Sequence, residues 1–443
     1  MQNPVTAAGN KVHAVTAPEQ APTIQQNVSA VYVATIWLGS QFTMPLADFE
    51  RFPFYIVFTG LMYLFLPIRA ILCSFLLLVI LVAYEVLKCV QVDFAFTSKG
   101  VLGLIAFSCV MSTTHFALLT VQDCSATQLG RWLRLVILVM AAGMTVEIGL
   151  TGLTLAEPVY QNYILPLPAF SGLFTEPSHF ALALSPLLFL AVNRSSVFRQ
   201  YIGTRYLWVM AGMAVLCPSA TLIAITALAA CISFSANALR LRAGGIAAVL
   251  VLAVVIAFAI VVVPQISERV FGVLSVNPYD PLGEQNLSAL LFEKQMAEYA
   301  LLNCPLGVAF LNMVILAPEA PVSYVADAVF YMNSQDGSSI LFKGICEMGI
   351  LFVLFSVVSF ISFFKGTTRV NSLSGLVVLS FQFAFFAHFI RAGSYFQGCL
   401  AIGLSACIFG LLELGPLRRF YNMGLGRSRS AGQARSAQAA FRV

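Results

Sequence analysis

The chain contains very little charge. Only 10% of its 443 residues are Asp, Glu, Lys or Arg, whereas 59% are hydrophobic. A soluble globular protein carries about 25% charged residues, so this composition excludes an ordinary soluble enzyme. The net charge of +5 comes largely from arginines in the segment 415–443. Such a tail is typical of a topology determinant that touches anionic lipid, and we expect no nucleic-acid partner.

The sequence also lacks the common catalytic and cofactor-binding motifs of soluble enzymes. The chain has no GxxxxGK[ST] phosphate loop, no HExxH, no GxSxG and no CxxC pair. Its 10 cysteines are scattered, mostly within apolar runs, and lack the spacing of metal ligands. We therefore predict no metal site, and any chemistry must take place at a membrane.

What the chain does have is a series of apolar runs. A helix of about twenty apolar residues crosses a hydrocarbon layer of about 30 Å, and it satisfies its own backbone hydrogen bonds there. We predict an all-α fold, a polytopic transmembrane bundle of about 12 helices with one large periplasmic loop that contains short helices. Three of the runs are short, which makes one of them a candidate re-entrant segment. The runs lie near 29–46, 53–67, 70–88, 101–121, 132–154, 177–193, 201–217, 219–237, 244–264, 338–363, 372–391 and 394–414.

Lys and Arg indicate the orientation of these helices. With both termini in the cytoplasm, the short inner loops carry more of these residues than the short outer segments do. The opposite orientation would place the basic tail outside, so we expect both termini to be cytoplasmic. The outer segments then hold Arg51, Lys88, Lys99 and Arg391.

This topology divides the chain into five parts. They are a disordered cytoplasmic leader at 1–27, a first transmembrane block of about nine helices at 28–264, a large periplasmic loop at 265–337, a second transmembrane block of about three helices at 338–414, and a basic, disordered cytoplasmic tail at 415–443. The leader has no apolar core before a cleavage site, so we expect the first spanning helix to act as the insertion signal. No internal repeat is evident, which disfavours an inverted-repeat transporter.

One segment of the large loop has the pattern of an amphipathic helix. In residues 288–303, apolar and charged side chains alternate at close to the helical period. Such a helix would lie on the membrane face or cap a cavity. The apolar positions are Leu291, Met296, Tyr299 and Leu302, and the charged ones are Glu293, Lys294 and Glu298.

Ionisable groups at membrane depth are costly, so each is a functional candidate. The first group is Glu176, Ser178 and His179, where an outer loop leads into a helix. One interpretation is an ordinary helix start, with Pro177 as the first helical residue. In the other, Glu176 and His179 meet a sugar hydroxyl, since a carboxylate near a helix N-terminus is stabilised as the anion.

The second group is His388 and Arg391, followed by Tyr395. The first two are three residues apart and share a helix face. Arg is the side chain best suited to paired recognition of phosphate oxygens. The alternative is an Arg that extends to the headgroup region.

A third pair, Lys343 and Glu347, is four residues apart in one apolar run. This spacing predicts either an intramembrane ion pair or two residues that line a cavity. Glu147 and His115 have no partner nearby in the sequence. We expect both to face the bundle interior and assign neither a catalytic role.

Four stretches of the chain resemble a known family. The run SGLFTEPSHFA at 171–181 resembles the "sGlf.EPs.fa" stretch of Wzy-type polysaccharide polymerases, members of the O-antigen polymerase and ligase superfamily. Three further stretches fit in order, and the resemblance covers about 130–415. They are PSATLI at 218–223, which resembles the small polar start of a helix, NCPLGV at 303–308, which resembles an "n.plGvG" turn, and DGSS at 336–339 through CEMGIL at 346–351, which resembles an "n....l.e.GilG" helix start.

The chain departs from the family pattern at three places. Ala309 stands where Gly is usual, and Lys294 stands near a common Arg position. The residues NSQD at 333–336 replace the His-Asn pair typical of ligases. The last departure favours a polymerase over a ligase.

The resemblance implies a glycosyltransferase that needs no metal or other cofactor, in the bacterial inner (cytoplasmic) membrane, with a periplasmic active face. Such enzymes polymerise undecaprenyl-diphosphate-linked oligosaccharide repeat units, which serve as donor and acceptor, into a surface or secreted polysaccharide. Besides membrane lipid, it suggests a chain-length-regulating membrane protein and a flippase as partners. The alternatives are an O-antigen ligase and a transporter or flippase of lipid-linked glycans.

The resemblance, together with the charge pattern, gives the ionisable groups expected roles. One of the catalytic candidates accepts the proton of the acceptor hydroxyl, and positioned cations stabilise the charge that develops on the departing diphosphate. The catalytic candidates are Glu176, His179 and Asp336; the diphosphate-binding candidates are Arg391, Lys294 and Arg269; the cavity-lining candidates are His388, Tyr395, Ser178, Lys343 and Glu347.

Overall fold

The structure, a computed structural model, describes residues 22–39, 43–46, 49–53, 55–63, 66, 68–89, 91, 97–153, 160–161, 168–238, 285–311, 313–316, 339–391 and 395–414. This part of the chain is mostly helical, with two short antiparallel strand pairs, β1–β2 and β3–β4. Its elements are α1 (Ile24–Gly39), β1 (Thr43–Leu46), β2 (Phe49–Pro53), α2 (Tyr55–Tyr63), α3 (Ile68–Cys89), α4 (Ser98–Gln122), α5 (Ala126–Gly152), β3 (Tyr160–Gln161), β4 (Pro168–Ala169), α6 (Pro177–Asn193), α7 (Ser195–Tyr201), α8 (Thr204–Leu216), α9 (Ala220–Ala238), α12 (Gln285–Asn303), a 3-10 turn η1 (Met313–Leu316), α14 (Ile340–Arg369), α15 (Leu373–Ala387) and α16 (Gly398–Leu414).

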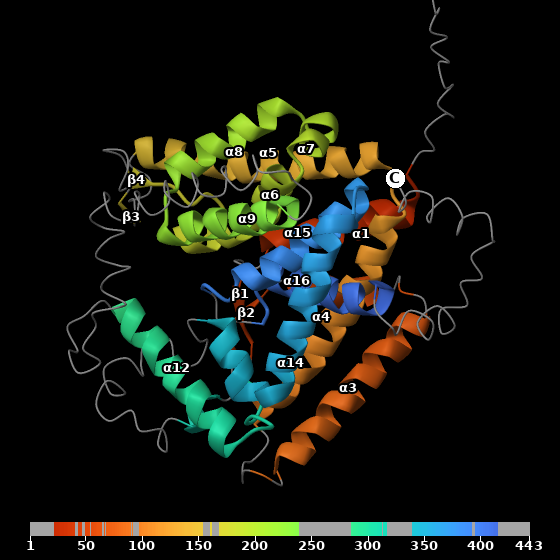
Figure 1. The fold of residues 1–443 in the computed structure, drawn as a ribbon, viewed down its shortest axis with the longest axis vertical. Helices are drawn as coiled ribbons and strands as arrows, with labels where there is room; N and C mark the ends of the chain where they lie inside the picture. The colour runs from red at the N-terminus through yellow and green to blue at the C-terminus, as the bar shows by residue number, and fades with distance from the viewer. Residues whose placement is uncertain are drawn as a thin grey trace, which may run out of the picture.

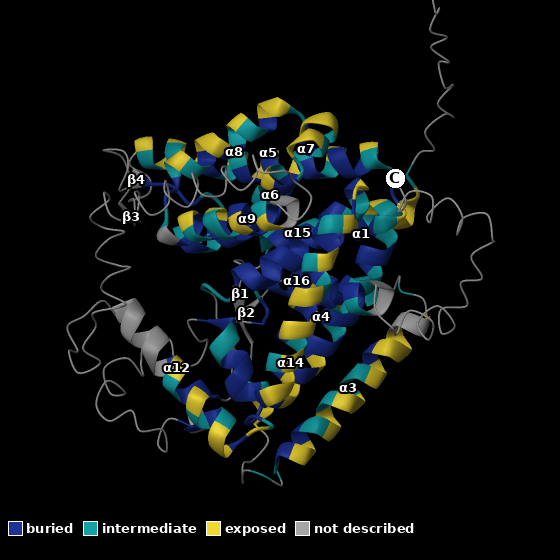
Figure 2. Ribbon diagram, in the orientation of Figure 1, coloured by how far each residue is buried: buried dark blue, intermediate teal, exposed yellow. Residues whose placement is uncertain are grey.

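Helices α15 and α16 occupy the centre of the bundle (Figure 1). Helix α15 packs against α16 and α6, and α6 packs in turn against α9. Nearly every residue of α15 is buried, which Figure 2 shows as a dark central segment. A helix that is apolar all round is expected to be enclosed by other helices or by lipid, and the packing shows that α15 is enclosed by helices.

Four helices in the described ranges are long and apolar enough to cross a membrane, namely α3 from Ile71 onward, α4, α5 and α14. A fifth span is possible if α6 and α7, which meet at a bend of 108°, form one broken span. Helices α8, α9, α15 and α16 are apolar but shorter. These helices indicate a membrane protein.

The outer helices differ in how much apolar surface they leave uncovered. Only 17% of the α3 span is buried inside the protein, against 67% of the α4 span. Soluble monomers rarely expose a continuous apolar patch of this kind, whereas a lipid-facing helix requires one. The α3 side chains left exposed include Ile71, Leu72, Phe75, Leu76, Val79 and Ile80.

The expected apolar runs agree with the observed helices in most places. Eleven of the twelve runs contain a helix, and the run near 244–264 lies outside the described residues. The first run differs, because α1 begins earlier, at Ile24, and ends at Gly39, and the strand β1 follows. This strand contains Pro45, which has no backbone N–H to continue a helix.

The amphipathic helix expected at 288–303 is present as α12, but its faces differ from the expected ones. Leu302, expected on the apolar face, is 83% exposed. Glu293, expected among the polar positions, is only 2% exposed. Its carboxylate accepts a hydrogen bond of 3.0 Å from the backbone N–H of Ser339, and this partner allows the carboxylate to be buried.

Candidate functional site

The loop before α6 is held against α5. Ser171 and Phe174 close a tight turn, in which the Ser171 hydroxyl donates to the Phe174 carbonyl at 2.6 Å. Gly172 has a φ of +68°, and its N–H donates to Glu147 Oε2 at 2.5 Å. Gly adopts this left-handed conformation without steric cost. Glu147, to which the sequence assigned no catalytic role, therefore anchors the loop that leads to Glu176.

Glu176 is the N-cap residue of α6, and Pro177 begins the helix. The Glu176 carboxylate makes no capping bond to the helix backbone; it accepts a hydrogen bond of 2.9 Å from the Ser178 hydroxyl. The His179 Nδ1 lies 3.0 Å from the Thr175 hydroxyl. The carboxylate and the imidazole thus each make a hydrogen bond to a nearby hydroxyl.

The end of α15 meets this loop. Arg391 Nη2 lies 3.5 Å from Glu176 Oε2, and the two side chains are 35% and 37% exposed. We call this pair, with Ser178, the Glu176–Arg391 site. A guanidinium and a carboxylate from segments more than two hundred residues apart therefore lie in contact. Both groups remain accessible to solvent or to a ligand.

A small pocket lies beside this site, with a volume of about 10 Å³ open to the centre of a water molecule. A volume of this size holds about one water molecule, so the pocket has no room for a sugar ring. We call it the His179–His388 pocket. Its lining residues are Trp37, Phe174, His179, Leu182, Ala183, His388, Gln397, Gly398 and Cys399.

His388 lies just beyond the last residue of α15 and is 1% exposed. Its Nδ1 lies 2.6 Å from the Ala384 carbonyl oxygen. A carbonyl can only accept, so Nδ1 carries the proton and donates it.

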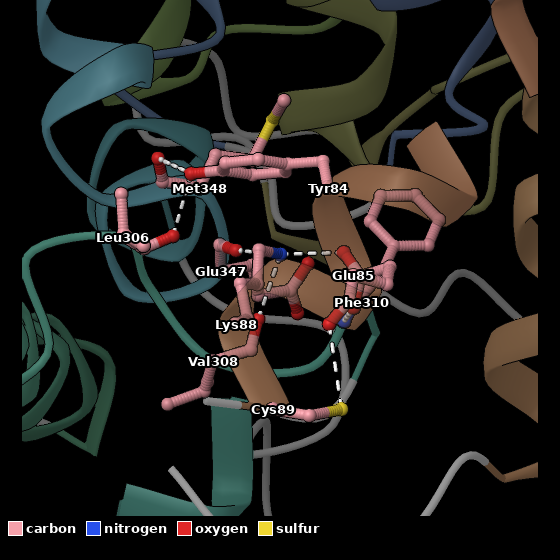
Figure 3. A network of polar contacts seen from close by, with 9 residues as sticks. All are labelled: Tyr84, Glu85, Lys88, Cys89, Leu306, Val308, Phe310, Glu347 and Met348. Atoms are coloured by element: carbon pink, nitrogen blue, oxygen red, sulfur yellow. Dashed lines mark hydrogen bonds and ion pairs between the residues drawn. The ribbon is translucent and has the colours of Figure 1, made fainter. Parts of the chain in front are cut away.

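A second polar cluster lies where α3 meets α14 (Figure 3). Lys88, in the last turn of α3, is 0% exposed. Its ammonium group donates to Glu85 Oε1 at 2.5 Å, to the Val308 carbonyl at 2.9 Å and to the Glu347 carbonyl at 2.6 Å. An ammonium has three N–H donors, so all three are used.

Tyr84 and Glu85 complete this arrangement. The Tyr84 hydroxyl lies 2.6 Å from the Leu306 carbonyl and 3.1 Å from the Met348 carbonyl. Glu85 Oε2 accepts from the Phe310 N–H at 3.0 Å. We call Tyr84, Glu85 and Lys88 the α3 clamp, because they hold the turn at 304–310 against α14.

Helix α14 is broken where this turn docks. Gly349 has a φ of +56° and a ψ of −142°, which is not helical. The Ile350 N–H donates to the Pro305 carbonyl at 2.9 Å, and the Val308 N–H donates to the Cys346 carbonyl at 2.8 Å. The turn thus satisfies backbone groups on both sides of the break, and the segments with the NCPLGV and CEMGIL sequences pack together.

The remaining cavity-lining candidates surround the α3 clamp. Lys343, Glu347 and Tyr395 are each 2% exposed or less. The Lys343 ammonium lies 5.7 Å from the centre of the Tyr395 ring, which stacks on Phe310 at 5.2 Å. Glu347 lies close to both Lys343 and Tyr395. These three side chains, like Ser178, are not among the residues that line the His179–His388 pocket.

Of the other phosphate-binding and catalytic candidates, one lies within the described residues. Lys294 is exposed on α12 and pairs with Glu298 at 3.5 Å. Arg269 and Asp336 lie outside the described residues. In the part of the chain that the structure describes, no three His, Cys, Asp or Glu side chains are placed to hold a metal ion.

The sequence reasoning missed three contributors. Lys88 was expected in an outer segment, but it lies inside α3 and is buried. Glu85 and Lys88 stand three residues apart in an otherwise apolar run, a spacing that places them on one helix face and was a usable signal. Glu293 connects α12 indirectly to the Glu176–Arg391 site. Its carboxylate binds the Ser339 N–H, and the Ser339 hydroxyl donates to the Phe389 carbonyl, two residues before Arg391, at 2.9 Å.

The fold and the two clusters define a helical protein with several helices able to cross a membrane and with ionisable groups concentrated near the ends of α3, α6, α14 and α15. No protein-family model, no curated protein and no solved structure matches the chain. Its own residues are therefore the basis for a functional assignment.

Proposed function

We propose that this protein is a membrane-embedded glycosyltransferase of the Wzy type. It polymerises undecaprenyl-diphosphate-linked oligosaccharide repeat units into a surface or secreted polysaccharide at the periplasmic face of the bacterial inner membrane. The supporting observation is the contact of 3.5 Å between Arg391 and Glu176, beside a pocket that contains two histidines. The Glu176 segment is also the one with the most specific resemblance to polymerases.

In the proposed reaction, a hydroxyl of the acceptor sugar attacks the anomeric carbon of the donor glycan. The bond between that carbon and the diphosphate oxygen breaks, and the electron pair leaves with undecaprenyl diphosphate. Arg391 binds the diphosphate, because a guanidinium can bind two phosphate oxygens at once. A cation fixed beside the leaving group stabilises the charge that grows on it. Glu176 orients the guanidinium until the diphosphate takes its place.

The position of the site suits large, lipid-anchored substrates. The His179–His388 pocket has room for about one water-sized group, so the glycan lies outside it, at the accessible Glu176–Arg391 site. The lipid carrier stays in the bilayer, beside the exposed apolar faces of the outer helices. Holding two such substrates in contact turns a bimolecular reaction into an effectively unimolecular one, which supplies much of the rate.

The contacts between helix ends support the topology that we propose from the charge pattern. On the side that we propose to be periplasmic, the start of α6 meets the end of α15, and the end of α3 meets the start of α14. On the opposite side, Arg194 at the end of α6 donates to the Thr367 carbonyl near the end of α14 at 3.2 Å. We propose about 12 spanning helices in total, with both termini cytoplasmic.

A flippase for lipid-linked glycans is the second candidate. Discontinuous helices are typical of transporters, and α14 is broken at Gly349. The two functions differ in what accumulates when the gene is deleted. Loss of a polymerase leaves single repeat units on the outer face, whereas loss of a flippase traps them inside. A ligase, in contrast, would leave finished polymer on its carrier.

The test uses Arg391→Ala and Glu176→Gln in cells that lack the native copy. We expect surface glycan to collapse from a ladder of long chains to single repeat units on a gel. The matched controls are Arg199→Ala, an exposed Arg whose hydrogen bonds to described residues go to Ser195 on its own helix, and Glu298→Gln, an exposed carboxylate on α12. Both controls should keep the ladder. A wild-type ladder from an Arg391→Ala, Glu176→Gln double variant present at normal levels would refute the proposal.

A further inference from the structure

The chain leaves α15 through two tight turns that end just before Arg391. In these turns the Phe389 N–H donates to the Phe386 carbonyl at 3.0 Å, and the Ile390 N–H donates to the Ala387 carbonyl at 3.1 Å. A carbonyl beyond the last helical turn has no N–H partner within the helix, so that of Phe389 depends on a group from elsewhere. Whatever binds it fixes the chain two residues before Arg391.

The hydroxyl of Ser339 is that group. It donates to the Phe389 carbonyl at 2.9 Å and accepts from the Leu341 N–H at 3.3 Å, which caps the start of α14. Ser339 is 0% exposed, so water has no access to replace either bond. The buried hydroxyl thus joins the start of α14 to the chain that follows α15.

The backbone of Ser339 is held in turn by Glu293. The Glu293 carboxylate, which is buried, accepts from the Ser339 N–H at 3.0 Å, and α12 packs against α14 (Figure 1). A hydrogen bond to a charged acceptor is stronger than one to a neutral acceptor, and burial strengthens it further. A series of hydrogen bonds therefore runs from α12 through Ser339 to the turn that leads to Arg391.

Given the proposed function, in which Arg391 binds the donor diphosphate, we propose that Ser339, held in place by Glu293, is a positioning residue for Arg391. The Arg391 side chain is long and 35% exposed. A fixed backbone limits the positions that such a side chain can reach, and the diphosphate then binds at a smaller entropic cost. Ser339 itself acts only through the Phe389 carbonyl.

Two pairs of variants break and keep these bonds at different points. Ser339→Ala removes the hydroxyl and keeps the N–H that Glu293 binds, whereas Ser339→Thr keeps both groups. Glu293→Met removes the acceptor, and Glu293→Gln keeps an oxygen that can accept from the same N–H. The matched control is Ser372→Ala. It also removes an N-cap hydroxyl, which accepts from the Gly375 N–H, but it does so at the opposite end of α15 from Arg391.

Amide hydrogen exchange measures the position of the turn without any substrate. The purified full-length protein in detergent is compared with its variants at the amides of Phe389 and Ile390. We expect exchange to rise about tenfold in Ser339→Ala and in Glu293→Met, as for the loss of about one hydrogen bond. Ser339→Thr, Glu293→Gln and the Ser372→Ala control should exchange at close to the wild-type rate.

Binding is measured with inorganic pyrophosphate as the probe. Phenylglyoxal modifies guanidinium groups, and mass spectrometry of the peptide that contains Arg391 gives the pyrophosphate concentration that protects this side chain by half. We expect that concentration to rise several-fold in Ser339→Ala and in Glu293→Met, because apparent affinity falls with the fraction of molecules in which Arg391 is in place. A role in stability alone would lower the unfolding temperature and leave the protecting concentration unchanged.

The proposal is overturned if pyrophosphate protects Arg391 equally well in the wild type and in folded Ser339→Ala, or if Ser372→Ala weakens protection as much. If Ser339→Ala yields no folded protein, Glu293→Met and Glu293→Gln decide by the same comparison. A wild-type protein in which pyrophosphate does not protect Arg391 is a different result. It refutes the diphosphate role of Arg391, and the proposed function fails with it.

Discussion

The α3 clamp and the Glu176–Arg391 site both contain oppositely charged side chains. They differ in how many hydrogen bonds the cation makes and in how exposed the charged groups are. Lys88 is fully buried, and each of its three N–H groups has an acceptor within 2.9 Å. Arg391 and Glu176 are about one-third exposed and meet at 3.5 Å. A saturated, enclosed charge can bind nothing further, whereas an accessible one can exchange its partner for a ligand. The first cluster is therefore structural and the second is suited to binding.

The largest effect on stability is expected from Lys88→Met. This change leaves the Glu85 carboxylate and two backbone carbonyls buried without their shared donor. Removing one partner of a buried ion pair costs about 3–5 kcal/mol. We expect a large drop in the thermal unfolding temperature of the protein in detergent, and a low folded yield.

Two controls show whether the loss comes from the stranded charge. Adding Glu85→Gln to Lys88→Met should recover part of the stability, because the buried carboxylate is then neutral. Lys294→Met breaks an exposed pair with Glu298 and should cost about 0–1 kcal/mol. If Lys88→Met and Lys294→Met lowered stability equally, the clamp would not be the structural element described above.

An intermediate effect is expected from Gly349→Ala, at the break in α14. The backbone there has a φ of +56°, which costs a residue with a side chain about 1–3 kcal/mol. An added Cβ would also overlap the Pro305 carbonyl oxygen. The matched control is Gly149→Ala in α5, where a Cβ meets nothing and the helix should gain about 0.5–1 kcal/mol. Thermal unfolding of the two variants should shift in opposite directions, and equal shifts would show that the turn does not dock tightly on α14.

The Glu176–Arg391 site could be predicted from the sequence better than the α3 clamp could. Periodicity and charge predict that the start of α6 and the end of α15 lie on one side of the membrane, and in the structure Glu176 and Arg391 are in contact. The partners of Lys88 could not be predicted, because two of them are backbone carbonyls more than two hundred residues away. A carbonyl has no sequence signature, so Lys88 looked like an ordinary outer-loop charge.

Burial of single polar residues was equally hard to predict. Glu293 belongs to the expected polar positions of α12, and only the position of the Ser339 N–H explains why it is enclosed. Glu147 looked isolated because its partner, Gly172, is a backbone N–H in a loop. For Glu293 the tertiary contact, not the helical period, decides which face of α12 is buried.

The smallest effect on stability is expected from Arg391→Ala, and this prediction sharpens the comparison most. An exposed ion pair contributes about 0–1 kcal/mol, because water and salt screen it, so the unfolding temperature of the variant should stay close to that of the wild type. Chain growth should nevertheless be lost, since the guanidinium is the proposed diphosphate ligand. Arg391→Lys keeps the charge but not the planar, two-donor geometry and should restore chain growth only in part. If Arg391→Ala unfolded as readily as Lys88→Met, the pair with Glu176 would be a structural contact, and the distinction between the two clusters would no longer hold.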